Sequence, residues 1–150
     1  MSPDIYIENL FDVLHDLSES LKWLNRSFEQ CKGIENIKEC TNDEIDDIEA
    51  FMSRFSRTSD LLIQKVFRSI DTVEFERPGT LLDALNRAEK KGLIKDVTTL
   101  RDIRETRNLV SHEYAAANFA KLFFAVLSLT PELISSCEKT LLYCERFKTA

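Results

Sequence analysis

Chain-breaking residues are scarce in this sequence, which has only three glycines and three prolines among 150 residues. Because turns depend heavily on these two residue types, such a chain can make few turns and favours long helices. The six breakers are Pro3, Gly33, Pro78, Gly79, Gly92 and Pro131. No segment between them has the alternating pattern of a convincing strand. The sequence therefore predicts an all-α, up-and-down bundle of about five helices, four of them long.

Capping residues and apolar spacing place the first two helices. Ser2 and Pro3 form a helix start, with proline at the first helical position. The following apolar residues alternate in steps of four and three, as in a bundle seam: Leu10, Leu14, Leu17, Leu21, Leu24 and Phe28. Gly33 ends this helix, and CKGIENIKEC is the expected loop. A capping box at 41–44 opens a second long helix, whose inner residues are Ile45, Ile48, Met52, Phe55, Leu62, Val66 and Ile70.

Three further helices are expected after the break at Pro78. A shorter helix begins at about residue 80 and stops at Gly92, a position typical of a helix C-terminal glycine. The next begins near Thr98, with an inner stripe of Leu100, Ile103, Val110 and Tyr114. The last apolar segment, 118–147, contains Pro131, which predicts a kink or a break there.

Size and composition indicate one soluble domain spanning residues 1–150. Apolar residues make up 43% and charged residues 31% of the chain, and no window approaches the roughly 18 uninterrupted apolar residues of a membrane span. The N-terminus lacks a signal-peptide pattern, so we expect a cytoplasmic protein with no membrane association. Cys31 and Cys40 could bridge a loop in an oxidising compartment, but a cytosolic chain favours free thiols.

Charge is unevenly distributed along the chain. Residues 1–50 carry 4 Lys/Arg and 13 Asp/Glu (net −9), residues 51–114 carry 12 and 10 (net +2), and residues 115–150 carry 4 and 3 (net +1). The total of −6 argues against a nucleic-acid partner, but the positive middle third can still attract an anionic ligand locally. The acidic first third is equally well explained as a solubilising face.

The stretch RETRNLVSHEYAA (104–116) concentrates functional groups in a predicted helix. At 100° per residue, Asn108 and His112 share one face, and Arg107 and Ser111 share the adjacent one. Arg107 and His112 are roughly 140° apart around the axis, so they cannot both point into one pocket of a single helix wall. A second copy of the same helix could complete the set, since two-fold pairing is the commonest soluble oligomer. A solvated face rich in polar groups is the alternative, and spacing alone favours it.

Histidine and arginine around a two-fold axis suit RNA cleavage. The reaction needs a base for the 2′-hydroxyl proton, an acid for the leaving 5′-oxygen and cations for the phosphorus oxygens. Histidine titrates near neutrality, and arginine matches phosphate with a rigid fork. No cofactor or metal is expected, since Cys31, Cys40, Cys137 and Cys144 lack the spacing of a metal clip.

The segment RNLVSHEY (107–114) resembles the R-x4-6-H signature of the HEPN superfamily, in the R-x4-H-x-Y form of HepT-type toxins. A polar residue after the arginine, here Asn108, is part of that pattern. The segments 54–67 and 80–94 are similar to flanking parts of small bacterial HEPN proteins encoded beside MNT-type nucleotidyltransferases. The resemblance covers about residues 45–120 and implies a homodimer with a HEPN-like four-helix core. Thr58-Ser59 departs from the pattern, where a larger apolar residue and a glutamine are expected.

The resemblance implies a metal-independent endoribonuclease toxin that acts on an RNA substrate. Arg107 would hold the phosphate, His112 would be the acid and base, and Asn108 would orient the histidine or substrate. An MNT-type antitoxin would silence the toxin, in some systems by adenylylating the motif tyrosine, here Tyr114. Further groove contacts are expected from a set of four residues: Arg54, Arg57, Arg104 and Ser111. For Arg54 and Arg57, salt bridges to Asp60 or neighbouring acids are the favoured interpretation.

Two other functions remain open from the sequence. Some HEPN relatives serve as non-catalytic substrate-binding or scaffolding partners of the nucleotidyltransferase, and a purely structural helical adaptor is also compatible with an all-helical chain. The Arg107, Asn108 and His112 set favours catalysis, because a scaffold has no physical need for it.

Overall fold

Five helical rods make up the part of the chain that the computed structural model describes, residues 3–112 and 116–149, which confirms the predicted all-α bundle. The elements in order are α1 (Pro3–Cys31), η1 (Ile37–Glu39), α2 (Asn42–Asp60), η2 (Leu61–Val66), α3 (Phe67–Val73), α4 (Leu81–Lys90), α5 (Val97–His112), α6 (Ala116–Tyr143) and η3 (Cys144–Thr149). Since α2, η2 and α3 follow one another without a gap, they form a single rod. Pro3 is the first helical residue, as expected; the proposed cap, Ser2, lies outside the described residues.

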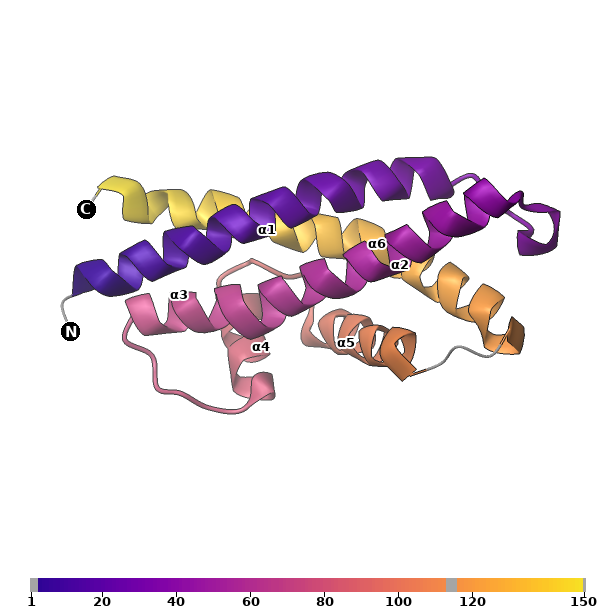
Figure 1. The fold of residues 1–150 in the computed structure, drawn as a ribbon. Helices are drawn as coiled ribbons and strands as arrows, with labels where there is room; N and C mark the ends of the chain where they lie inside the picture. The colour runs from indigo at the N-terminus through magenta and orange to yellow at the C-terminus, as the bar shows by residue number, and fades with distance from the viewer. Residues whose placement is uncertain (1–2, 113–115, 150) are drawn as a thin grey trace.

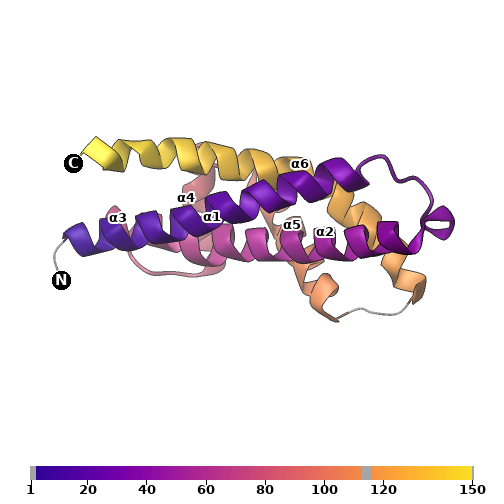
Figure 2. The same ribbon diagram turned by 45° about the horizontal axis from the view of Figure 1, so that its top comes forward.

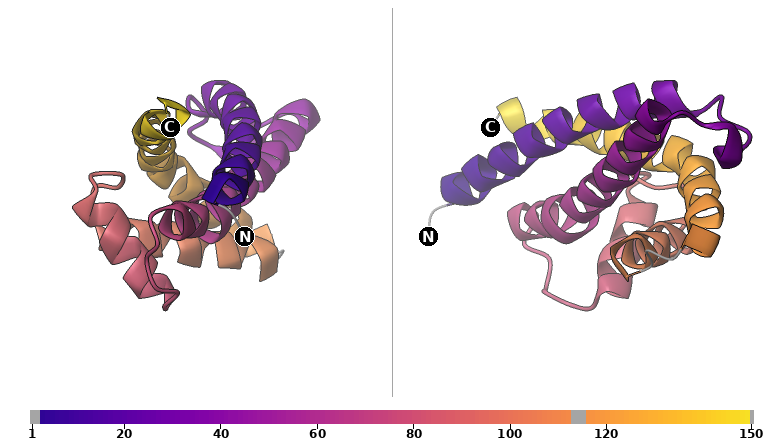
Figure 3. Two further views of the ribbon diagram at one scale, coloured as in Figure 1. Left: turned by 90° about the vertical axis from the view of Figure 1, so that its left-hand side faces the viewer. Right: turned by 45° about the vertical axis from the view of Figure 1, so that its right-hand side comes forward.

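The long rods lie side by side, with both chain ends at the same end of the molecule (Figure 1). The helix α1 packs antiparallel along α2, and α6 runs back beside α1 (Figures 1 and 2). The shorter α4 and α5 lie on the side of the α2–α3 rod away from α1, as the end-on view of Figure 3 shows. The helix α5 contacts both α2 and α6. One wall of the molecule is therefore built from α5 and the middle of the α2–α3 rod.

The predicted seam of α1 is buried in the core. Its five leucines are at most 7% exposed: Leu10, Leu14, Leu17, Leu21 and Leu24. Small polar residues complete the contact with α2, where the buried hydroxyls of Ser20 and Thr58 form a 2.7 Å hydrogen bond. Thr58 and Ser59, the departure from the HEPN pattern, are thus buried where α1 and α2 pack closely.

The second rod differs from a uniform α-helix at η2, which is a π-helical segment. The Phe67 N–H donates to the carbonyl of Leu62, five residues back. The expected inner residues Leu62, Val66 and Ile70 are nevertheless buried, and Ile63 and Phe67 are buried with them. Such π-turns occur frequently at functional sites, and this one begins directly after Asp60.

The helix α6 continues through Pro131, so the break considered possible there is absent. Proline removes one backbone hydrogen bond, and the Thr130 hydroxyl donates to the carbonyl of Val126 at 2.6 Å, a bond that often accompanies helix bending. Figures 2 and 3 show α6 changing direction along its length. By length and composition alone, Asn118–Lys148 is apolar enough to cross a membrane. One such helix is weak support for a span, because the core helix of a soluble protein has the same length and composition; here 33% of the apolar window is buried.

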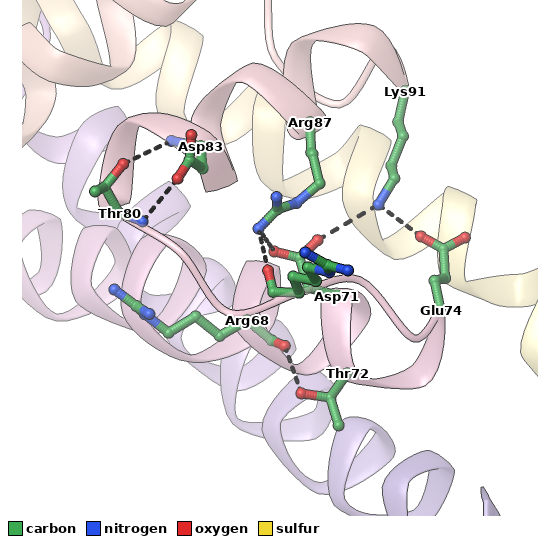
Figure 4. Close-up of polar contacts among 9 residues, drawn as sticks. Arg68, Asp71, Thr72, Glu74, Thr80, Asp83, Arg87 and Lys91 are labelled. Atoms are coloured by element: carbon green, nitrogen blue, oxygen red, sulfur yellow. Dashed lines mark hydrogen bonds and ion pairs between the residues drawn. The ribbon is translucent and has the colours of Figure 1, made fainter.

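A polar network joins α4 to the end of α3 (Figure 4). Asp71, 8% exposed, accepts a 3.0 Å hydrogen bond from Arg87 and lies 3.6 Å from the Lys91 ammonium. Lys91 also pairs with Glu74 at 2.6 Å. The pKa of Arg87 is raised, chiefly by its hydrogen bond to Asp71. These contacts hold α4 against the long rod and thereby position the start of α5.

The predicted capping residues and the predicted free thiols are confirmed as well. Thr41–Glu44 forms the expected capping box, and Thr80 and Asp83 form another at the start of α4. Gly92 has a φ of 76°, the left-handed conformation that glycine adopts readily. All four cysteines are free thiols, and burial raises the pKa of Cys31 to about 11.

Candidate nucleic-acid interface

The buried stripe of α5 continues into Arg107, which follows Ile103 by one helical turn, and Arg104 and Asn108 lie beside it on the side that faces α2. Asp96 caps the helix by accepting a 2.7 Å hydrogen bond from the Thr99 N–H. Leu100 and Ile103 are fully buried, as the expected inner stripe requires. Val110 is half-buried, and Tyr114, the last member of that stripe, lies outside the described residues.

Arg107 is held in place from two directions. Its Nε donates to Asp60 Oδ1 and its Nη2 to Asp60 Oδ2, both at 2.7 Å. Its Nη1 donates to the hydroxyl of Ser111, one turn further along α5. This fork-to-carboxylate geometry is the strongest pairing that arginine makes. The hydrogen bond to Asp60 is also the main cause of the raised pKa of Arg107. The guanidinium is therefore fixed in orientation before any ligand arrives.

A groove of about 910 Å³ runs between α5 and the junction of α2 with η2. Its lining residues are Ser53, Ser56, Arg57, Asp60, Leu61, Gln64, Lys65, Arg104, Arg107 and Asn108. Four cationic side chains face one carboxylate, so the lining carries a net charge of about +3. Asp60 is already paired with Arg107. Arg57, Lys65 and Arg104 make no hydrogen bond or ion pair to any described residue. Such a groove suits a polyanion.

His112 is the last residue of α5 and its side chain is exposed. It lies one turn beyond Asn108, but it does not line the groove that contains Arg107 and Asn108. Within one chain, the structure thus brings Arg107, Asn108 and Arg104 together and leaves His112 beside them. Ser111 contacts Arg107 rather than the groove. The proposed modification site, Tyr114, lies outside the described residues.

The prediction that Arg54 and Arg57 form salt bridges is wrong. Their expected partner, Asp60, pairs with Arg107 instead. Arg54 points toward α1, where its Nη1 donates to the buried Ser27 hydroxyl at 2.7 Å. Arg57 lines the groove, as its alternative role required. Arg54 lines only a neighbouring depression.

Sequence reasoning missed the pairing of Arg107 with Asp60 and the contributions of Gln64 and Lys65. Asp60 and Arg107 are 47 positions apart, and no local pattern links two charges so far apart. A signal did exist on the second helix, since Arg57, Asp60 and Gln64 follow one another at helical spacing.

In the described part of the chain, no three His, Cys, Asp or Glu side chains gather as a metal site would require. Comparisons with protein-family models, curated proteins and solved structures give no match.

Proposed function

We propose that this chain is a metal-independent endoribonuclease of the HEPN type, the toxin of a HEPN/MNT pair. The observation that carries the proposal is the fixed Arg107 fork on the wall of a cationic groove. Surface salt bridges contribute little to stability, so a doubly hydrogen-bonded arginine beside unpaired cations is better explained by anion binding. Asn108 adds an amide that can donate to substrate in the same groove.

In the proposed reaction, the RNA backbone occupies the groove and Arg107 binds a phosphate oxygen. A histidine base removes the 2′-hydroxyl proton, and the 2′-oxygen attacks phosphorus. The bond from phosphorus to the 5′-oxygen then breaks, and a histidine acid protonates that oxygen. The products are a 2′,3′-cyclic phosphate and a 5′-hydroxyl. Arg107 stabilises the charge that builds on the non-bridging oxygens.

The histidine comes from a second copy of the chain, whose His112 acts first as the base and then as the acid, because His112 does not line the groove of its own chain. An apolar surface suited to such pairing adjoins α5. Leu109 is 49% exposed, and it borders a depression of about 240 Å³ lined also by Thr106, Asn118, Lys121, Leu122 and Ala125. Pairing across this surface would bring the exposed end of α5 toward the partner.

Regulation by an MNT-type nucleotidyltransferase completes the proposal. Adenylylation of Tyr114 would add a phosphate charge and a purine close to Arg107 in the sequence, and so compete with RNA for the groove. The mass of the chain purified after co-expression with such an enzyme would report the added group directly.

Cleavage of single-stranded RNA in EDTA tests the proposed function. We expect the wild-type protein to leave cyclic phosphate ends, and His112→Ala to lose at least roughly a hundredfold in rate. His15→Ala is the matched control, because His15 is the other histidine and lies exposed on α1. Full activity in His112→Ala, or cleavage that requires a divalent metal, would exclude this assignment.

A further inference from the structure

Trp23, the only tryptophan of the chain, is 44% exposed on α1. Two guanidinium groups lie near its ring, those of Arg54 at 5.0 Å and Arg26 at 5.8 Å from the ring centroid. Arg54 is anchored because it also donates to the buried Ser27 hydroxyl. Arg26 is exposed and makes no hydrogen bond or ion pair within the described ranges. The ring is therefore supported by one anchored arginine and contacted by a second that no hydrogen bond or ion pair to a described residue holds.

The surface around Trp23 continues into the cationic groove. A depression of about 400 Å³ is lined by Glu19, Ser20, Trp23, Ser53, Arg54 and Arg57. Two of these residues, Ser53 and Arg57, also line the groove that contains Arg107. An extended ligand can thus pass from α5 across α2 to α1 with Arg57 at the junction.

We infer that Trp23 is a base-stacking subsite for single-stranded RNA whose backbone occupies the groove beside Arg107. This inference rests on the proposed function and names its substrate class. An unpaired base stacks on the indole and displaces the exposed Arg26, while Arg54 keeps the ring in position. The phosphate next to that base lies at Arg57 on α2, and the carboxylate of Glu19 on α1 repels phosphates from its own part of the lining.

The chemistry of the subsite selects single strands over duplexes. Bases inside a duplex are stacked on one another and cannot reach an aromatic side chain, whereas bases of a single strand can. Aromatic stacking tolerates any base, because every base has a π-face. A groove of arginines alone would instead bind duplex and single strand by charge.

Tryptophan fluorescence tests the subsite without any substitution, because Trp23 is the sole emitter of its kind. The ligand is an oligoadenylate with 2′-O-methyl groups, which has no free 2′-hydroxyl and so cannot be cleaved by the proposed reaction. We expect saturating single strand to quench the emission by about half or more, as contact with a stacked base requires. A duplex of equal length should leave the emission unchanged.

Affinity measured with a fluorescently labelled oligoadenylate gives the second readout. Trp23→Ala should weaken binding about 5- to 100-fold, the range for losing one stacked base, and Trp23→Phe should lose less. The matched control is Phe75→Ala, which removes a 73% exposed aromatic side chain after α3. It should bind as the wild type does.

Unchanged emission at saturation, or wild-type affinity in Trp23→Ala, would overturn the subsite while leaving RNA cleavage in EDTA unaffected. If single strand quenches the emission but no RNA is cleaved, the stacking subsite would be supported and the nuclease assignment would be excluded. A wild-type protein that binds no single strand would overturn the stacking inference as well.

Discussion

The pair formed by Arg107 and Asp60 matters for orientation more than for stability. Both side chains are partly exposed, at 27% and 42%, and ion pairs screened by solvent in this way contribute about 1 kcal/mol or less. The geometry, by contrast, is specific: two 2.7 Å bonds and a third contact to Ser111 define the direction of the guanidinium. Substitutions here should therefore change activity far more than melting temperature.

Arg107→Lys separates charge from geometry. Lysine keeps the positive charge but cannot form the fork to Asp60, so we expect cleavage in EDTA to fall at least roughly tenfold. The melting temperature should shift by no more than about 4 °C. Single-turnover cleavage and thermal unfolding measure the two effects. Arg101→Lys, on the exposed side of the same helix, is the control, and full activity in Arg107→Lys would mean that charge alone suffices.

The sequence indicated Arg104, Arg107 and Asn108 as neighbours because all three lie on one short helical stretch. It could not indicate their partner across the groove. The position of Asp60 depends on how α2 and α5 pack, and that depends on core residues spread over the whole chain. His112 shows the same limit, since its absence from the groove lining depends on how α5 packs on α2.

The stability of the helix α5 depends on its first turn. Asp96 accepts a hydrogen bond from the Thr99 N–H, and that bond lowers the pKa of the Asp96 carboxyl. A lowered pKa in the folded state means that the stabilisation is complete above the unfolded value, about 4. It is lost as the pH falls through the folded-state value.

Asp96→Ala should therefore lower the melting temperature at pH 7 by roughly 2–4 °C, the usual effect of losing a cap in a chain of this size. The difference from the wild type should shrink as the pH is lowered below about 4. Thermal unfolding followed by circular dichroism at several pH values measures it. Asp102→Ala removes an exposed carboxylate of the same helix and should show no such dependence; equal shifts in both variants would contradict the capping role.

Helix positions were predictable because their signals are local. Capping boxes at Thr41 and Thr80, and Gly92 at the end of α4, act through neighbouring backbone groups. No local sequence signal indicates the π-helical segment η2, because its backbone hydrogen bonds depend on how the rod packs on α1. The continuation of α6 through Pro131 was equally undecided, because tertiary contacts can stabilise a helix that proline weakens.

The proposed site requires two chains, and Leu109 lies on the surface that would join them. If the chain pairs as proposed, Leu109→Asp should make it a monomer at micromolar concentration and abolish cleavage, because the substitution places a charge in an apolar contact. Light scattering and the cleavage assay measure the two outcomes. Leu142→Asp is the control, since Leu142 is 75% exposed near the other end of α6. A wild-type monomer that cleaves RNA would contradict the two-chain site.

The π-helical segment also limits which insertions and deletions the gene can accept in the second rod. A π-turn holds one residue more than the α-turn that would replace it. Deleting one residue from η2 would therefore restore a regular helix and leave everything beyond it in about its present orientation, whereas deleting one residue from the α-helical part, α2, would rotate everything beyond it by about 100°. Asp71 would then face away from Arg87, and α4 would lose its attachment. A one-residue deletion in this rod should therefore be tolerated within η2 and not within α2.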